Sequence, residues 1–155
     1  LDDVTKENIH REIMNKVPFY FKGPNHGPTE LFEPSVKFFT KQRVIPFKKY
    51  IKLHRNLECR NFYKLSKGRA LFICIHPKYK SLFKHKDHIF EHNQDIIQYI
   101  KSNASFIHVL LDAGNVLFLP NYWLIFIVAK EESVIEKIQY STLLNQACFK
   151  LKKYI

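Results

Sequence analysis

The sequence has 155 residues, a length that fits one domain with a full hydrophobic core and without a stabilising metal or disulfide. Hydrophobic residues make up 46% of it and charged residues 25%, which excludes an intrinsically disordered chain. The formal net charge of +11 is typical of a chain with an acidic partner, which could be a nucleic acid, an anionic membrane or a protein surface in a larger assembly, and it equally fits a solvated basic surface. Because the basic residues are spread along the chain without a long basic block, we expect the protein partner.

Cysteine content and hydropathy predict the compartment. Cys59, Cys74 and Cys148 form no C-x-x-C pair, and their odd number argues against a closed disulfide framework. This pattern predicts an intracellular, reducing compartment. The longest apolar run, 122–129, is shorter than the roughly 18 residues that a membrane span needs. Because the sequence begins at Leu1 and not at Met, we expect it to be part of a longer protein.

Residues 1–34 are predicted to be an N-terminal helix and arm. A short helix is expected within 1–16, followed by an irregular connection over 17–34, where four prolines interrupt regular hydrogen bonding. The connection carries large apolar side chains that are costly to leave in water, so we expect it to pack on the chain's own core or on a neighbouring chain. The side chains of this interaction arm are Phe19, Tyr20, Phe21, Leu31 and Phe32.

Residues 35–155 have the pattern of a β domain with one inserted helix. Strands are expected at 36–41, 50–53, 61–65, 70–75, 106–111, 116–120 and 124–128, with an interruption at Pro46. A helix is expected over 87–103, and the segment 134–144 fits either a helix or a strand. Many short strands separated by turns predict a sandwich or barrel. We expect 116–119 and 124–128 to be neighbouring strands with Trp123 buried near their junction.

Two segments resemble one family, the cupin-like JmjC oxygenases. The stretch LLDAGNVLFLPNYW, residues 110–123, is similar to the "pGDvLfiP" turn and strand that precede a Trp-Trp-His in this family. The nearest subgroup is the asparaginyl hydroxylase type that acts on hypoxia-inducible factor. His54, Arg55 and Asn56, followed by Gly68, resemble the family's H-x-D iron motif and its later G-x-K/R turn. The resemblance covers roughly residues 35–144 and implies a double-stranded β-helix, or jelly roll.

The resemblance also implies a metal site whose ligands are lost. The family holds Fe(II) with two His and one carboxylate, and it holds 2-oxoglutarate with a basic side chain. His54 matches the first ligand, whereas Asn56 takes the carboxylate position and Ile125 the position of the second His. Ala70 takes the basic position, and Arg69 beside it is expected on the other face of the strand. These are therefore vestigial positions, and we expect no catalytic residue, no metal and no cofactor.

A displaced metal site is one alternative. The sequence contains a literal H-x-D at His85 and Asp87, and His88 and His92 would share one face of a helix. We expect these residues to form a solvated polar face rather than a metal site.

A cysteine nucleophile is another alternative. Cys74 and His76 would share one face of a strand, and Cys59 lies near His54 in sequence. A small apolar cysteine in a strand is more often part of a core. The aromatic residues, which could stack on nucleic-acid bases, are also expected in the core because they occupy strand positions among Ile and Leu.

The sequence therefore favours a non-catalytic, cupin/JmjC-like structural or interaction module. Its richness in Lys, Ile, Asn, Phe and Tyr is typical of an AT-rich genome and suggests a minor virion component of a large DNA virus. Two other functions stay open: an active Fe(II)/2-oxoglutarate-dependent hydroxylase with unusual ligands, and a basic nucleic-acid-binding module.

Overall fold

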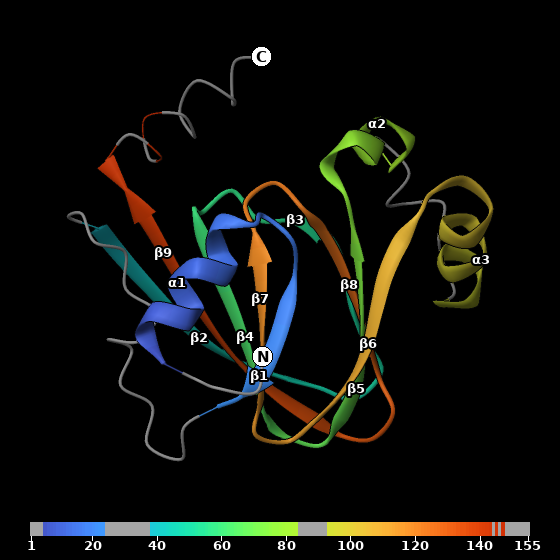
Figure 1. Cartoon of the computed structure of the whole chain (residues 1–155). Helices are drawn as coiled ribbons and strands as arrows, with labels where there is room; N and C mark the ends of the chain where they lie inside the picture. Colours follow the sequence, from blue (N-terminus) through green and yellow to red (C-terminus); the bar gives the residue numbers. More distant parts are fainter. Residues whose placement is uncertain (1–4, 24–37, 84–92, 144, 146, 148–155) are drawn as a thin grey trace.

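Strands dominate the computed structural model, which describes residues 5–23, 38–83, 93–143, 145 and 147 (Figure 1). The strands are β1 (Phe19–Lys22), β2 (Phe38–Phe47), β3 (Tyr50–Arg55), β4 (Arg60–Lys67), β5 (Arg69–Ile75), β6 (Phe106–Asp112), β7 (Asn115–Pro120), β8 (Leu124–Ala129) and β9 (Ser133–Thr142). The helices are α1 (Lys6–Met14), the 3-10 helix η2 (Pro77–Tyr79), α2 (Lys80–Phe83) and α3 (Asn93–Asn103). The predicted mainly-β class is confirmed. No helix in the described ranges is long and apolar enough to span a membrane.

The strands form two antiparallel sheets. One has the order β1-β7-β4-β9-β2 and the other the order β3-β8-β5-β6. The pairs are nested along the chain, because β5 pairs with β6, β4 with β7, β3 with β8 and β2 with β9. The chain thus runs as one long antiparallel ribbon whose successive pairs alternate between the two sheets. Strand β1 adds a fifth strand beside β7.

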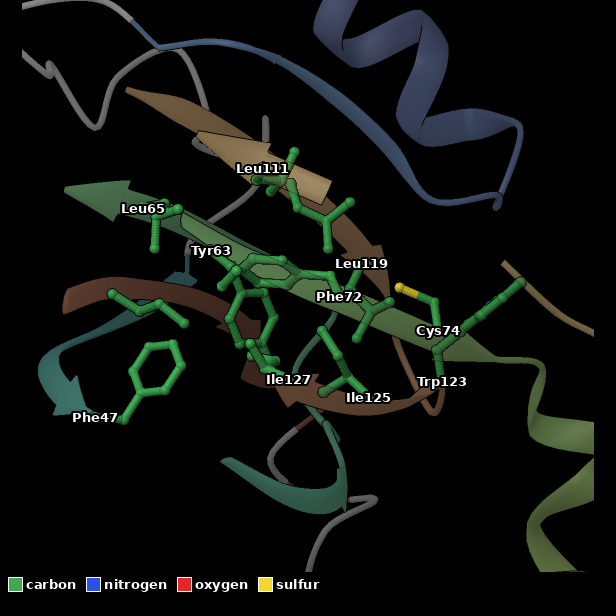
Figure 2. Packing of buried hydrophobic residues seen from close by; sticks show 13 residues of the cluster. Phe47, Tyr63, Leu65, Phe72, Cys74, Leu111, Leu119, Trp123, Ile125 and Ile127 are labelled. Atoms are coloured by element: carbon green, nitrogen blue, oxygen red, sulfur yellow. The ribbon is translucent and has the colours of Figure 1, made fainter. Parts of the chain in front are cut away.

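Apolar side chains fill three layers. Figure 2 shows the cluster between the sheets, with Tyr63 of β4, Phe72 of β5 and Ile125 of β8 pointing into it. Helix α1 packs through the buried Ile9 against the outward side chains of the five-stranded sheet. Helix α3 packs through Ile100 against those of the four-stranded sheet. Because apolar layers cover both faces at β5, β7 and β8, these three strands are nearly continuous apolar runs rather than alternating ones.

Two strand predictions need correction, and one open choice is decided. Residues 19–22, expected in an irregular connection, form β1, since Phe21 buries its side chain beside Phe118 and Phe62. Pro46, expected to interrupt a strand, lies within β2, which is the last strand of its sheet and leaves the missing amide at an edge. The segment 134–144 is strand β9 up to Thr142, between β4 and β2.

Other predictions are borne out in part. Trp123 is buried as expected, 7% exposed, but β7 and β8 on its two sides belong to different sheets and are not neighbours. The predicted helix over 87–103 is present from Asn93 onward as α3, and residues 84–92 lie outside the described residues. The short helices η2 and α2 were not expected from the apolar pattern.

Two glycines provide a matched test of the turns. Gly68 joins β4 to β5 with a φ of 88°, and Gly114 joins β6 to β7 with a φ of 96°. A Cβ at Gly68 would lie 2.4 Å from the Glu132 carbonyl oxygen, whereas one at Gly114 would meet nothing within 4 Å. We expect Gly114→Ala to cost about 1–2 kcal/mol for the left-handed backbone alone. Gly68→Ala should cost about 1–3 kcal/mol more, because the β8–β9 turn must also shift.

Urea denaturation of the two variants measures this difference. Equal losses in the free energy of unfolding would contradict the close packing of Gly68 against the β8–β9 turn.

Candidate functional site

The inner face of the sandwich changes from apolar to polar toward one end. Along β9 the inward side chains run from Ile135 through Lys137 to Gln139, and along β4 they run from Leu65 through Tyr63 to Asn61. Strand β3 and the β3–β4 connection complete this end. We name the polar cluster by its seven side chains: His54, Asn56, Glu58, Asn61, Tyr63, Lys137 and Gln139. Five of them are buried, while His54 and Glu58 are half-buried.

The structure brings three of the positions that the resemblance predicts to be vestigial, His54, Asn56 and Ile125, to this end. His54 on β3 lies directly opposite Ile125 on β8, so the two side chains share the inner face of their sheet. Asn56 follows β3 and is buried. Ala70 is also buried in the inner cluster, where it pairs with Ala129 of β8, and makes no polar contact.

His54 is held in one tautomer. Its Nδ1 lies 2.8 Å from the Lys52 carbonyl oxygen, which only accepts, so Nδ1 carries the proton. Its Nε2 is then an acceptor, 3.3 Å from the Tyr63 hydroxyl and 3.4 Å from the Lys137 Nζ. Burial lowers the pKa of His54, and the positive charges of Lys137 and Arg43 lower it further. The ring is therefore neutral near pH 7.

Tyr63 and Gln139 link the other members of the polar cluster. The Asn56 amide donates to the Tyr63 hydroxyl, whose pKa burial raises far above its ordinary value. The Gln139 Nε2 lies 2.8–3.2 Å from three oxygens, which belong to Asn56, Glu58 and Asn61. The Gln139 Oε1 is buried without a hydrogen-bond partner. Because its Nε2 has only two protons, Gln139 can serve two of the three oxygens at once.

Lys137 is the cationic centre of the polar cluster. Its side chain is 6% exposed, and its Nζ lies 5.3 Å from the centroid of the Tyr63 ring. Burial lowers the pKa of Lys137 to about 8, the charges of Arg43 and Lys41 act in the same direction, and Glu58 opposes them. The one ion pair among the described residues joins Arg69 to Asp112, so Lys137 is a buried ammonium without a carboxylate partner there.

The remaining candidate residues do not form a second reactive site. Burial raises the pKa of the Cys74 thiol to about 12, while His76 is exposed and uses its Nδ1 to cap η2. The Cys59 thiol donates to the Tyr140 carbonyl, and burial raises its pKa. Neither cysteine is a thiolate near pH 7. Arg69 points outward to Asp112 at 3.2 Å, as the strand alternation predicts, and cannot replace a basic group at Ala70.

The proposed H-x-D cluster and part of the interaction arm lie outside the described residues. These are His85, Asp87, His88, His92, Leu31 and Phe32. No group of three or more His, Cys, Asp or Glu side chains in the described ranges could hold a metal ion.

The described part of the arm packs on its own sheet. Phe19 contacts Phe118 with ring centroids 5.1 Å apart, and Phe21 is buried, while Tyr20 between them is 49% exposed. Phe19 and Phe21 therefore need no neighbouring chain to leave water. Tyr20 is the described arm residue that is exposed to solvent.

Sequence reasoning missed five members of the polar cluster, namely Glu58, Asn61, Tyr63, Lys137 and Gln139. The signal was present in 134–144, because the positions that alternate with Ile138 and Tyr140 hold Lys137 and Gln139. A strand with polar residues on its inward face marks a polar interior. This signal could not be recognised from the sequence, because the segment 134–144 fitted both a helix and a strand.

Comparisons with known proteins add no family assignment. No family model matches the chain, and a search of curated proteins gives no match.

The buried ammonium can be tested by its effect on stability. Because the pKa of Lys137 is lower in the folded chain than in the unfolded one, its charge destabilises the fold at pH 7, and the penalty fades as the pH rises from about 8 to 10.5. We expect Lys137→Met to raise the free energy of unfolding by about 1–2 kcal/mol at pH 7 and by clearly less at pH 10.

Urea denaturation of both proteins at the two pH values checks this. Lys67→Met, which removes an exposed lysine, should change stability by less than about 0.5 kcal/mol at either pH. A loss of stability in Lys137→Met at pH 7 would contradict the description of this lysine as a desolvated charge.

Proposed function

We propose that this chain is a non-catalytic relative of the cupin-like JmjC oxygenases, and that it serves as a structural or interaction module for an acidic protein partner. The strand pairing supports the implied fold. Eight strands, β2 to β9, are paired as a nested ribbon that alternates between two sheets, which is the arrangement of a jelly roll. The segments HRNLECR (54–60) and GNVLFLPNYW (114–123) begin at the end of β3 and just before β7, which supports the order expected from the family.

The observation that carries the proposal is the pairing of His54 with Ile125. Two strands bring the positions of the two family histidines directly opposite each other, yet only one of them holds a ligating side chain. Fe(II) at such a site needs nitrogen and carboxylate ligands on one face of the ion. Ile125 has no donor atom, and the Asn56 amide nitrogen and oxygen are engaged with Tyr63 and Gln139.

The remaining ligand is also unsuited to a cation. The Nε2 of His54 carries the one lone pair of the ring that could bind a metal, and the Lys137 Nζ lies 3.4 Å from it. A divalent ion bound to Nε2 would face this ammonium at close range in a partly desolvated site. The residues present therefore do not fit Fe(II), and no step of oxygenase chemistry is derived for this chain.

Charge and exposed apolar surface support the interaction role. The chain carries a net charge of +11, and large apolar side chains are exposed at the end of α1, before β1 and on β1, namely Met14, Val17 and Tyr20. An acidic partner with an apolar centre would match both features.

Restoring the ligands tests the loss of iron chemistry. The triple variant Asn56→Asp, Ile125→His, Lys137→Met supplies two histidines and one carboxylate and removes the opposing ammonium. We expect it to bind Mn(II), a stable substitute for Fe(II), at least about tenfold more tightly than the original chain. The matched control Asn56→Asp, Ile125→Leu, Lys137→Met lacks the second histidine and should not gain this affinity.

Calorimetric titration with Mn(II) measures the gain. Tight Mn(II) binding by the unmodified chain that is lost in His54→Ala would contradict the proposal and favour an active hydroxylase.

A salt titration separates the protein partner from a nucleic acid. A basic nucleic-acid-binding module would bind labelled DNA or RNA with an affinity that falls steeply as salt displaces it from the phosphates. We expect no binding of either oligonucleotide at about 150 mM salt, measured by fluorescence anisotropy, because the basic residues are spread along the chain without a long basic block. Micromolar or tighter binding at that salt concentration would overturn the choice of a protein partner.

A further inference from the structure

The Lys137 ammonium has hydrogen-bonding capacity that the described residues do not use. Its three protons have one acceptor there, the Nε2 of His54 at 3.4 Å, and its other neighbour is the face of the Tyr63 ring. Glu58 is the only carboxylate of the polar cluster, and its Oε2 accepts from Gln139 at 2.8 Å. A lysine this deeply buried is normally paired with an anion.

Like charges from β2 surround the same point. Arg43 lies directly opposite Lys137 in the register of β2 and β9, and Lys41 lies directly opposite Gln139. Side chains that are directly opposite share one face of a sheet, so Arg43 and Lys41 lie on the inner face beside Lys137. Both are exposed, which places them at the rim of the polar end rather than in its interior. Opposed like charges destabilise a pair of strands unless an anion lies between them.

We propose that Lys137, Arg43 and the His54–Tyr63 pair form a binding site for a small oxyanion, which is a carboxylate or phosphate group. The oxyanion enters at β2, the edge strand of the five-stranded sheet. In this site Lys137 contributes a buried positive charge with two free N–H donors. Arg43 adds a planar pair of donors at the rim, which suits two oxygens of one ligand group. His54 is a positioning residue, because its neutral Nε2 accepts from Lys137 and fixes the direction of the ammonium.

The polar cluster selects against large or cationic ligands. Lys137 is only 6% exposed, so a bulky group cannot reach it without rearranging the strands. The described groups that act electrostatically on Lys137 are two cations of β2, Arg43 and Lys41, and one carboxylate, Glu58 of the β3–β4 connection. The rings of His54 on β3 and Tyr63 on β4 also face it. With Arg43, Lys41 and Lys137 against one carboxylate, the balance is positive. This inference is independent of the proposed interaction role and needs no metal.

The binding site should be sensitive to pH in a known direction. The pKa of Lys137 is about 8 in the free chain, and a bound anion raises it. Affinity should therefore be nearly constant below pH 8 and fall above it, as Lys137 loses its proton. Arg43 stays charged throughout, and protonation of His54 at acid pH would add a further positive charge.

Titration with two probes tests the proposal. We expect malonate and inorganic phosphate, added to the full chain with EDTA at constant ionic strength and pH 7, to bind saturably. Each should raise the melting temperature by about 3–6 °C once it exceeds its Kd about twentyfold. The ratio of the two Kd values distinguishes a carboxylate ligand from a phosphate ligand.

Matched variants locate the binding site. Lys137→Met should weaken malonate binding about tenfold or more and abolish its fall between pH 7 and pH 9.5, because one charged hydrogen-bond donor is lost. Arg43→Gln should weaken it about three- to fivefold, since this side chain is exposed. Lys67→Met removes the same charge from an exposed position and should leave the Kd within about twofold.

Two results would overturn the proposal. One is the absence of saturable binding for both probes in the unmodified chain. The other is an equal loss of affinity in Lys137→Met and Lys67→Met, which would show a general effect of net charge. Circular dichroism of the unmodified chain and of both variants checks that each is folded. A loss of affinity in a folded variant cannot be assigned to unfolding. Neither result would bear on the partner or on the lost iron ligands.

Discussion

A sandwich whose strands are buried on both faces must satisfy every polar side chain that it turns inward, and this constraint organises the polar end of the molecule. The Tyr63 hydroxyl is central to it, because it accepts from Asn56 and lies 3.3 Å from the His54 Nε2. Through Asn56 the same network reaches Gln139 on β9, the strand beside β4 in the five-stranded sheet. An unsatisfied group at this depth costs about 1–3 kcal/mol, so the cluster holds β3, β4 and β9 in register as well as closing the end of the core.

The apolar part of the fold was largely predictable from sequence, and the reason is local. Runs such as 70–75 and 124–128 are buried on both faces, and their strand length and bounding turns are visible without any partner. What was not predictable depends on partners distant in the chain. Phe21 is a strand residue only because β7 offers an edge, and Pro46 is tolerated only because β2 is the last strand of its sheet. Neither fact is written in the neighbouring residues.

The candidate site divides in the same way. The resemblance to the JmjC oxygenases placed the first iron-ligand position at His54 and the second histidine position at Ile125. The structure pairs these two residues directly. The resemblance carried no information on Lys137, because this residue belongs to β9, where the pattern fitted both a helix and a strand. The three-dimensional arrangement adds the physical point that Asn56 and Ile125, neither of which is a good ligand for Fe(II), are accompanied by a buried ammonium. A positive charge next to His54 is a stronger obstacle to a cation than the loss of a ligand alone.

The inward placement of Lys137, Arg43 and Lys41 also changes what the net charge means. A charge of +11 read from composition suggests a basic surface, but these three cations lie on the inner face of the five-stranded sheet and bear on its interior. Long-range attraction to a partner depends on the whole excess, whereas the cost of desolvation falls on Lys137 alone. The fold can retain such a residue if its stability is sufficient without compensation, or if an anion compensates it when bound. The second condition links stability to ligand concentration, so the same lysine that weakens the free chain would strengthen the liganded one.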